Sequence, residues 1–215
     1  MSSSPLNVAV LIYDGVELVD MNGPVDVFYH ASLFTNNRYN IFTIAETPDA
    51  VGSEGGIVTI VPKYAFTSEH PTPDIVIIPG QLNANGVPIV ASDAVVNWIK
   101  TVAGNNATIL AVCVGIYHVA KSGLLNGKKA TTHYMAINQF HIDYPEIQII
   151  KNVRYVEDGQ FVTTAGISSG IDGALYLIEK NDGADMAQQV ADLMIYNRAA
   201  PLPPYTILPP YYPAG

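Results

Sequence analysis

Short, strongly apolar runs alternate with longer amphipathic segments along this chain of 215 residues. The run from Asn7 to Tyr13 is almost wholly apolar, which is typical of a strand buried on both faces of a parallel sheet. The same pattern predicts strands at residues 39–45, 57–61, 74–80, 108–112, 147–150, 154–157 and 161–164. Apolar residues at helical spacing predict helices at residues 17–34, 92–102, 116–120, 171–180 and 184–196. Because strands and helices alternate, we expect an α/β fold with a mainly parallel sheet covered on both faces.

The last segment breaks this pattern. Between Pro201 and Gly215 the chain holds six prolines and three tyrosines. Proline excludes a helix or a central strand here, so the sequence predicts an extended polyproline arm. We therefore divide the chain into an α/β domain at residues 1–198 and a Pro/Tyr-rich arm at residues 199–215. Composition leaves open whether the arm is a loose tail or packs its tyrosines on its own domain or a second subunit.

Composition narrows the class of partner. The 10 Lys and Arg residues stand against 19 Asp and Glu, a net charge of −9, which argues against nucleic acid or an anionic membrane as partner. No apolar run reaches the roughly 18 residues that span a bilayer, and no secretory leader is evident. The single cysteine excludes an intrachain disulfide and a zinc site of several thiolates. We expect a cytoplasmic protein that acts on a small molecule, without a metal or a cofactor, because metal-ligand spacings and phosphate-binding glycine loops are missing.

The single cysteine is the most informative residue for function. Cys113 directly follows a predicted strand, and Gly115 stands where the next helix is expected to begin. A residue at such a turn projects from the carboxyl edge of the sheet, where open α/β sheets bind their ligands. The helix N-terminus predicts a lowered thiol pKa, and the N–H of Val114 would face a developing negative charge. A lone buried cysteine is often only a packing residue, so the turn is what makes Cys113 a candidate nucleophile.

A nucleophilic cysteine needs a proton partner and donors for negative charge. Asp14, Glu17 and Asp20 all follow the first strand, and position alone does not choose among them. The apolar neighbours of Asp20 in the sequence indicate that it is more buried than Asp14. A later strand ends in Pro-Gly, which exposes the N–H of Gly80 or Gln81 for an oxyanion hole.

The histidines are the remaining candidate bases. His133 is expected near the same sheet edge, whereas His118 lies five residues beyond Cys113 on a helix and faces away. His141 and Asp143 fall in a polar stretch. Since lone histidines are more often packing residues than bases, we keep only His133 as a candidate supporting residue.

Five stretches form a set that occurs together in a known family. They are residues 13–24 (YDGVELVDMNGP), 77–80 (IIPG), 111–115 (AVCVG), 123–133 (GLLNGKKATTH) and 164–172 (TAGISSGID). With them the chain resembles the ThiJ/PfpI superfamily, relatives of the class I glutamine amidotransferases. It is most similar to the isonitrile hydratase-like branch, which also holds the ligand domains of AraC-type regulators. The resemblance implies a flavodoxin-like three-layer sandwich that forms a homodimer.

The resemblance also implies a site and a reaction. The family's elbow cysteine matches Cys113, and its acid, four residues before a proline, matches Asp20. Gly80, Gln81 and Val114 match the backbone donors. The implied reaction hydrates an isonitrile to an N-substituted formamide through a thioimidate on the cysteine, with the acid as proton donor.

Glu17 and His133 would support this pair, and the chain departs from the family at two nearby positions. Val114 stands where the hydratases carry Thr and the family's proteases carry His, which weakens the isonitrile assignment and argues against a protease. Gln81 stands where a second Gly often follows Pro-Gly, and its side chain is expected to narrow or polarise the pocket. The regulators carry a helix-turn-helix domain after this one, where this chain has the proline arm. Two alternatives stay open: a non-catalytic ligand-binding or redox-sensing domain, and a glyoxalase- or deglycase-like activity.

Overall fold

The computed structural model describes residues 4–83, 85 and 87–207, and one sheet of seven strands runs through its centre in the order β10-β11-β7-β6-β1-β2-β5. The strands are β1 (Leu6–Leu11), β2 (Tyr39–Ala45), β5 (Tyr64–Ala65), β6 (Ile75–Ile78), β7 (Thr108–Ala111), β10 (Tyr155–Asp158) and β11 (Phe161–Thr164). Neighbours in this sheet pair in parallel, except that β10 and β11 form an antiparallel hairpin. The predicted mainly parallel sheet is confirmed.

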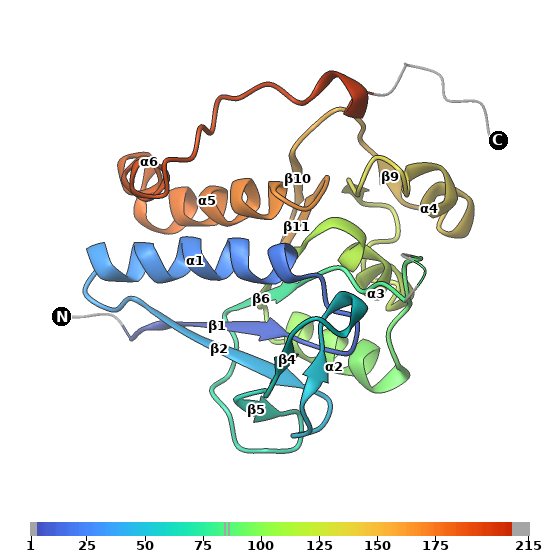
Figure 1. The fold of residues 1–215 in the computed structure, drawn as a ribbon, viewed down its shortest axis with the longest axis horizontal. Helices are drawn as coiled ribbons and strands as arrows, with labels where there is room; N and C mark the ends of the chain where they lie inside the picture. Colours follow the sequence, from blue (N-terminus) through green and yellow to red (C-terminus); the bar gives the residue numbers. More distant parts are fainter. Residues whose placement is uncertain (1–3, 84, 86, 208–215) are drawn as a thin grey trace.

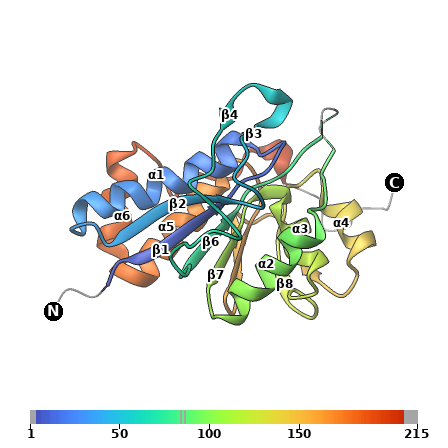
Figure 2. The ribbon, with the colours of Figure 1, turned by 90° about the horizontal axis from the view of Figure 1, so that it is seen from below.

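Helices cover both faces of the sheet (Figures 1 and 2). On one face α1 (Leu18–Phe34), α5 (Ser169–Asp182) and α6 (Ala184–Leu193) pack against one another. On the other lie α2 (Asp93–Gly104) and α3 (Ile116–Lys121), with α4 (Ile137–Asp143) joined to α3 by an edge-to-face contact of Tyr117 with Phe140. The three-layer sandwich implied by the resemblance is therefore confirmed.

Burial explains why the central strands are so apolar. All four residues of β6 are buried, as are the last four of β1, because helices lie against both faces of these strands. Phe28 of α1 is fully buried, and burial of such a side chain contributes about 1.5–3 kcal/mol to the free energy of folding. The core therefore fixes the carboxyl ends of β1, β6 and β7, which carry the candidate site.

Several predicted elements differ in the structure. The strand predicted at residues 57–61 shrinks to β4 (Thr59–Ile60), paired antiparallel with β3 (Val51–Gly52). The strand predicted at 147–150 is β9 (Gln148–Ile149), which pairs with β8 (Lys129–Ala130) outside the main sheet. The last helix ends at Leu193 rather than 196, and α4 was not predicted because only Ile137 and Phe140 of its seven residues are buried.

The described part of the arm lies on its own domain. After α6 the chain runs along the α5 side of the molecule to a single turn, η3 (Pro204–Thr206) (Figure 1). Arg154 holds its start, since Nη2 donates to the carbonyl of Ala200 at 2.8 Å. Tyr211 and Tyr212 lie outside the described residues. In the described part of the chain, no helix combines the length and the apolar character needed to cross a membrane.

Candidate active site

A sharp turn places Cys113 at the carboxyl edge of the sheet. After β7 the backbone of Cys113 takes a positive φ of 56° and continues through a 3-10 turn, η2 (Cys113–Gly115), into α3. Gly115 permits this turn, because a Cβ at that position would lie 2.1 Å from the carbonyl oxygen of Ile78. The end of β6 and the turn therefore pass closer together than any other residue at position 115 would allow.

Asp20 approaches the same turn from the first turn of α1. Its side chain is fully buried, and Oδ2 accepts a hydrogen bond from the N–H of Gly80 at 2.8 Å. Its other carboxyl oxygen, Oδ1, has no hydrogen-bond partner among the described residues. The carboxyl of Glu17 caps the helix by accepting from the N–H of Asp20 at 2.6 Å. The structure thus selects Asp20, among the three acids after β1, as the one beside Cys113.

The Asp20 carboxyl and the Cys113 thiol line the same cavity, and the charge of Asp20 makes ionisation of the thiol less favourable. Burial raises the pKa of Asp20 well above its usual range, and the nearby Glu17 carboxylate raises it further. Burial also raises the pKa of Cys113, as does the charge of Asp20, while the N–H of Val114 lowers it. Simultaneous ionisation of both groups is therefore disfavoured.

The expected lowering of the thiol pKa by a helix N-terminus is wrong. The helix after the turn has only six residues, and Cys113 is 7% exposed. Loss of solvent and the neighbouring acid outweigh the favourable N–H of Val114. A free thiolate is therefore disfavoured at Cys113.

The predicted backbone donors separate into different roles. The N–H of Gly80 is occupied by Asp20, so it positions the acid and is not free for a substrate. Gln81 turns away: its side-chain amide donates to the carbonyl of Asp14 at 2.7 Å, and it lines a different cavity. The expectation that Gln81 narrows the pocket is therefore wrong. Of these residues, Val114 directs its N–H at the cysteine and lines the cavity.

A cavity of about 510 Å³ opens onto this pair. Glu17, Asp20, Cys113 and His133 line it, and burial lowers the pKa of His133, which leaves that ring neutral near pH 7. Most other lining residues are apolar and come from the loop after β6, from α3, from the start of α4 and from the loop before α5: Leu82, Val87, Pro88, Val90, Val114, Tyr117, Met135, Ala136 and Ile167. The volume suits a small molecule.

Residues 6–180 of the chain match the DJ-1/PfpI family. The chain belongs to this family. It is 31% identical to the isonitrile hydratase of Pseudomonas putida over 93% of its own length and 81% of that enzyme. It is 32% identical to the HTH-type transcriptional regulator CdhR of Pseudomonas aeruginosa over 50% of the chain and 32% of the regulator. Among solved structures, Drosophila melanogaster DJ-1beta superposes with a TM-score of 0.74 at 20% identity, over 90% of this chain and 99% of that one.

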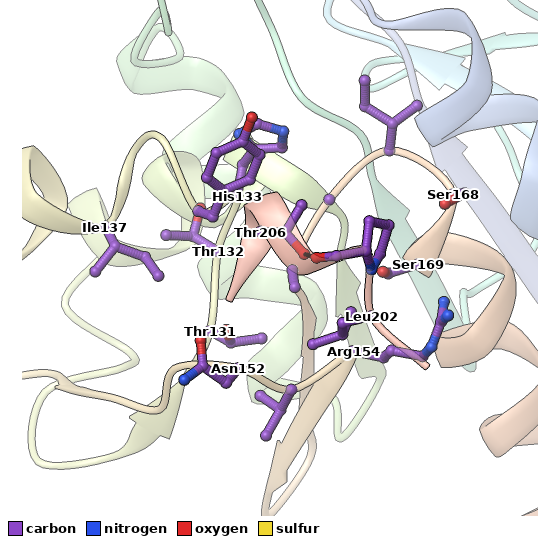
Figure 3. A pocket seen from close by; sticks show the side chains of 16 residues that line it. Thr131, Thr132, His133, Ile137, Asn152, Arg154, Ser168, Ser169, Leu202 and Thr206 are labelled. Carbon is purple, nitrogen blue, oxygen red and sulfur yellow. Dashed lines mark hydrogen bonds between the residues drawn. The ribbon is translucent and has the colours of Figure 1, made fainter. Parts of the chain in front are cut away.

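This DJ-1/PfpI chain has a second, smaller cavity of about 270 Å³, which His133 also lines (Figure 3). Ser168 and Ser169 face it from the start of α5, and Leu202 and Thr206 close it from the arm. His133 and Ile167 line both cavities and so divide them. The arm is therefore a wall of the region next to the candidate site.

His118 lies outside the site. His118 is fully buried, its Nδ1 accepts from the N–H of Ala91, and it lines neither cavity, as its predicted orientation requires. Within residues 4–83, 85 and 87–207 no three His, Cys, Asp or Glu side chains come together in a way suited to a metal ion.

Sequence reasoning missed residues that reach the site from α3 and α4. Tyr117 lines the cavity four residues beyond Cys113, on the same side of the helix, a spacing that could have been used. Gln139 and Asp143 line it from α4, which gave no periodic signal. Thr132 fixes the turn by donating its hydroxyl to the carbonyl of Cys113 at 2.9 Å.

Proposed function

We propose that this protein is a cysteine-dependent hydratase of a small molecule, and that it hydrates an isonitrile to an N-substituted formamide. The observation that carries the proposal is that buried Asp20 and Cys113, whose pKa values are both raised by burial, line one mostly apolar cavity. The likeness to the Pseudomonas putida isonitrile hydratase supports it. No step requires a cofactor.

The first step joins the substrate to the sulfur. The terminal carbon of R–N≡C takes the proton of the pair through Asp20, and the sulfur of Cys113 bonds to that carbon, giving the neutral thioimidate R–N=CH–S. Protonation and attack together avoid a free thiolate, which burial disfavours here. The N–H of Gly80 holds the carboxyl in place for the transfer.

The second step releases the product. Water adds across the C=N bond, with its hydroxyl on carbon and its proton on nitrogen. The C–S bond then breaks, the hydroxyl proton passes to Asp20, and R–NH–CHO leaves. The sulfur and the carboxyl end with the one proton that they began with, so the sum is R–NC plus water giving the formamide.

The test is a panel of alkyl and aryl isonitriles with purified protein, followed by the formyl proton signal in NMR spectra. We expect formamide from the wild type, none from Cys113→Ala, and a reduction of about 10²-fold or more from Asp20→Asn, which removes the acid. Exposed Asp185 on α6 supplies the matched control, and Asp185→Asn should keep full activity. Formamide production that survives Cys113→Ala would refute covalent catalysis, and no turnover of any member refutes the isonitrile assignment.

A non-catalytic sensing role is the second candidate, supported by the similarity to a transcriptional regulator. In its redox form two molecules of hydrogen peroxide each transfer one oxygen atom to the sulfur and leave as water, giving a sulfinic acid. Mass spectrometry after mild peroxide treatment tests it, and an unmodified Cys113 counts against it. The homodimer and the cytoplasmic location stay predictions.

A further inference from the structure

The charges around the candidate cavity all have one sign. Its lining includes the carboxyl groups of Glu17, Asp20 and Asp143, and no Lys or Arg is found among the described lining residues. The single basic ring, His133, is kept neutral because burial lowers its pKa. Oδ1 of Asp20 is completely buried without a hydrogen-bond partner among those residues, so the cavity's inner end is itself built for a ligand.

Asp143 places a further carboxylate at the outer end. It is an exposed residue at the end of α4, and the side-chain amide of Gln139 donates to its Oδ1 at 2.8 Å. Burial first, and then the charge of Asp143, raise the pKa of Tyr117 to about 12. The carboxylate is therefore near enough to a cavity wall to act on what lies against that wall.

The rest of the lining is mostly apolar and includes Leu82, Val87, Val90, Met135, Ala136 and Ile167. A substrate whose reacting carbon sits at Cys113 keeps its other end in the same cavity, which Gln139 and Asp143 also line. A negative group on that end would leave water for a cavity with three acids and no cation to pair with it.

We propose that the cavity selects substrates by charge: it accepts isonitriles whose substituent is neutral or cationic and rejects those that carry an anionic group, with Asp143 as the outer selecting residue. This inference rests on the proposed function for its reaction, and on the lining of the cavity for its selectivity. One carboxylate at close range in a partly solvated site changes affinity by about three- to tenfold.

The experiment compares isocyanoacetate with 2-isocyanoacetamide, which have nearly the same shape and differ in charge. We expect kcat/KM for the anion to be at least about tenfold below that for the amide. Asp143→Asn should raise kcat/KM for the anion by about threefold or more and change the amide far less. Asp185→Asn, which removes a charge far from the cavity, should leave the ratio unchanged, and 1 M salt should reduce it.

A separate binding experiment distinguishes a failure of this inference from a failure of the proposed function. The products N-formylglycine and N-formylglycinamide are titrated into the folded Cys113→Ala variant and followed by ligand-observed NMR. Tighter binding of N-formylglycinamide than of N-formylglycine supports charge selection. If at the same time neither isonitrile is turned over, only the proposed reaction is refuted. Equal binding and equal kcat/KM for the two members, or a ratio that Asp143→Asn does not change, overturns the inference.

Discussion

Gly80 offers a sharp test of how the acid is positioned. A Cβ added at this position would lie 2.7 Å from Oδ2 of Asp20 and 2.9 Å from Cγ2 of Val114, whereas ordinary van der Waals contact begins at about 3.4 Å. In Gly80→Ala the carboxyl must therefore retreat by roughly 0.7 Å, which stretches and weakens its 2.8 Å hydrogen bond from the Gly80 N–H. Displacement of a reacting group by about 1 Å lowers turnover by about 10²-fold.

We expect Gly80→Ala to lower kcat for formamide formation by about 10- to 100-fold and to leave KM nearly unchanged. The overpacked methyl should cost about 1–3 kcal/mol of unfolding free energy, measured in urea. Gly104→Ala is the matched control, because nothing lies within 4 Å of its Cβ at the end of α2. The Gly104→Ala variant should keep full activity, and its unfolding free energy should rise by about 0.5–1 kcal/mol. A folded Gly80→Ala protein with wild-type kcat would refute the positioning of Asp20.

Three further predictions concern single side chains. Val114→Thr adds a hydroxyl in the cavity and should raise kcat for formamide formation by about tenfold. This factor is the effect of one additional hydrogen bond of roughly 1.4 kcal/mol. An unchanged or lower kcat would contradict a role for that hydroxyl. Burial lowers the pKa of His118 to about 3, so below pH 6.5 the unfolded chain binds a proton that the folded chain refuses. As the pH is lowered from 6 to 4, the unfolding free energy should fall by up to about 1.4 kcal/mol per pH unit. His118→Gln should reduce this slope, because glutamine does not take up the proton and its side chain can still accept the hydrogen bond from the N–H of Ala91. Equal slopes for the wild type and the variant in urea titrations would contradict this role of His118. Arg154→Gln removes the donor to the carbonyl of Ala200 and should speed chymotryptic cleavage of residues 199–207, whereas an unchanged rate would show that other contacts hold the arm.

Strand and helix periodicity predicts a mainly parallel sheet covered on both faces and a turn at Cys113, whereas the three-layer flavodoxin-like sandwich was implied by the resemblance to the ThiJ/PfpI superfamily. The mostly apolar runs of β1, β6 and β7 are largely buried, and the Cys-x-Gly sequence after β7 specifies the turn at Cys113. These features depend on residues close together in the sequence, which is why they can be predicted without the structure.

The details of the site depend on contacts between distant segments and could not be predicted. Gly80 lies 60 residues from Asp20, and its N–H is already occupied by that carboxyl. The direction of the thiol pKa follows from burial, which outweighs the short helix after Cys113. The side chain of Gln81 points away because a carbonyl on the loop after β1 accepts its amide. The outer wall of the cavity is built by α4, whose polar sequence shows no helical period.

The central claim is that the Cys113 sulfur bonds to the isonitrile carbon while Asp20 supplies the proton. Rapid-quench mass spectrometry of the wild type during turnover tests it most directly. Our account predicts a peptide containing Cys113 that is heavier by the mass of one isonitrile molecule, forming before the formamide and much more slowly in Asp20→Asn. Formamide released at the full rate while every Cys113 peptide keeps its original mass would contradict the account.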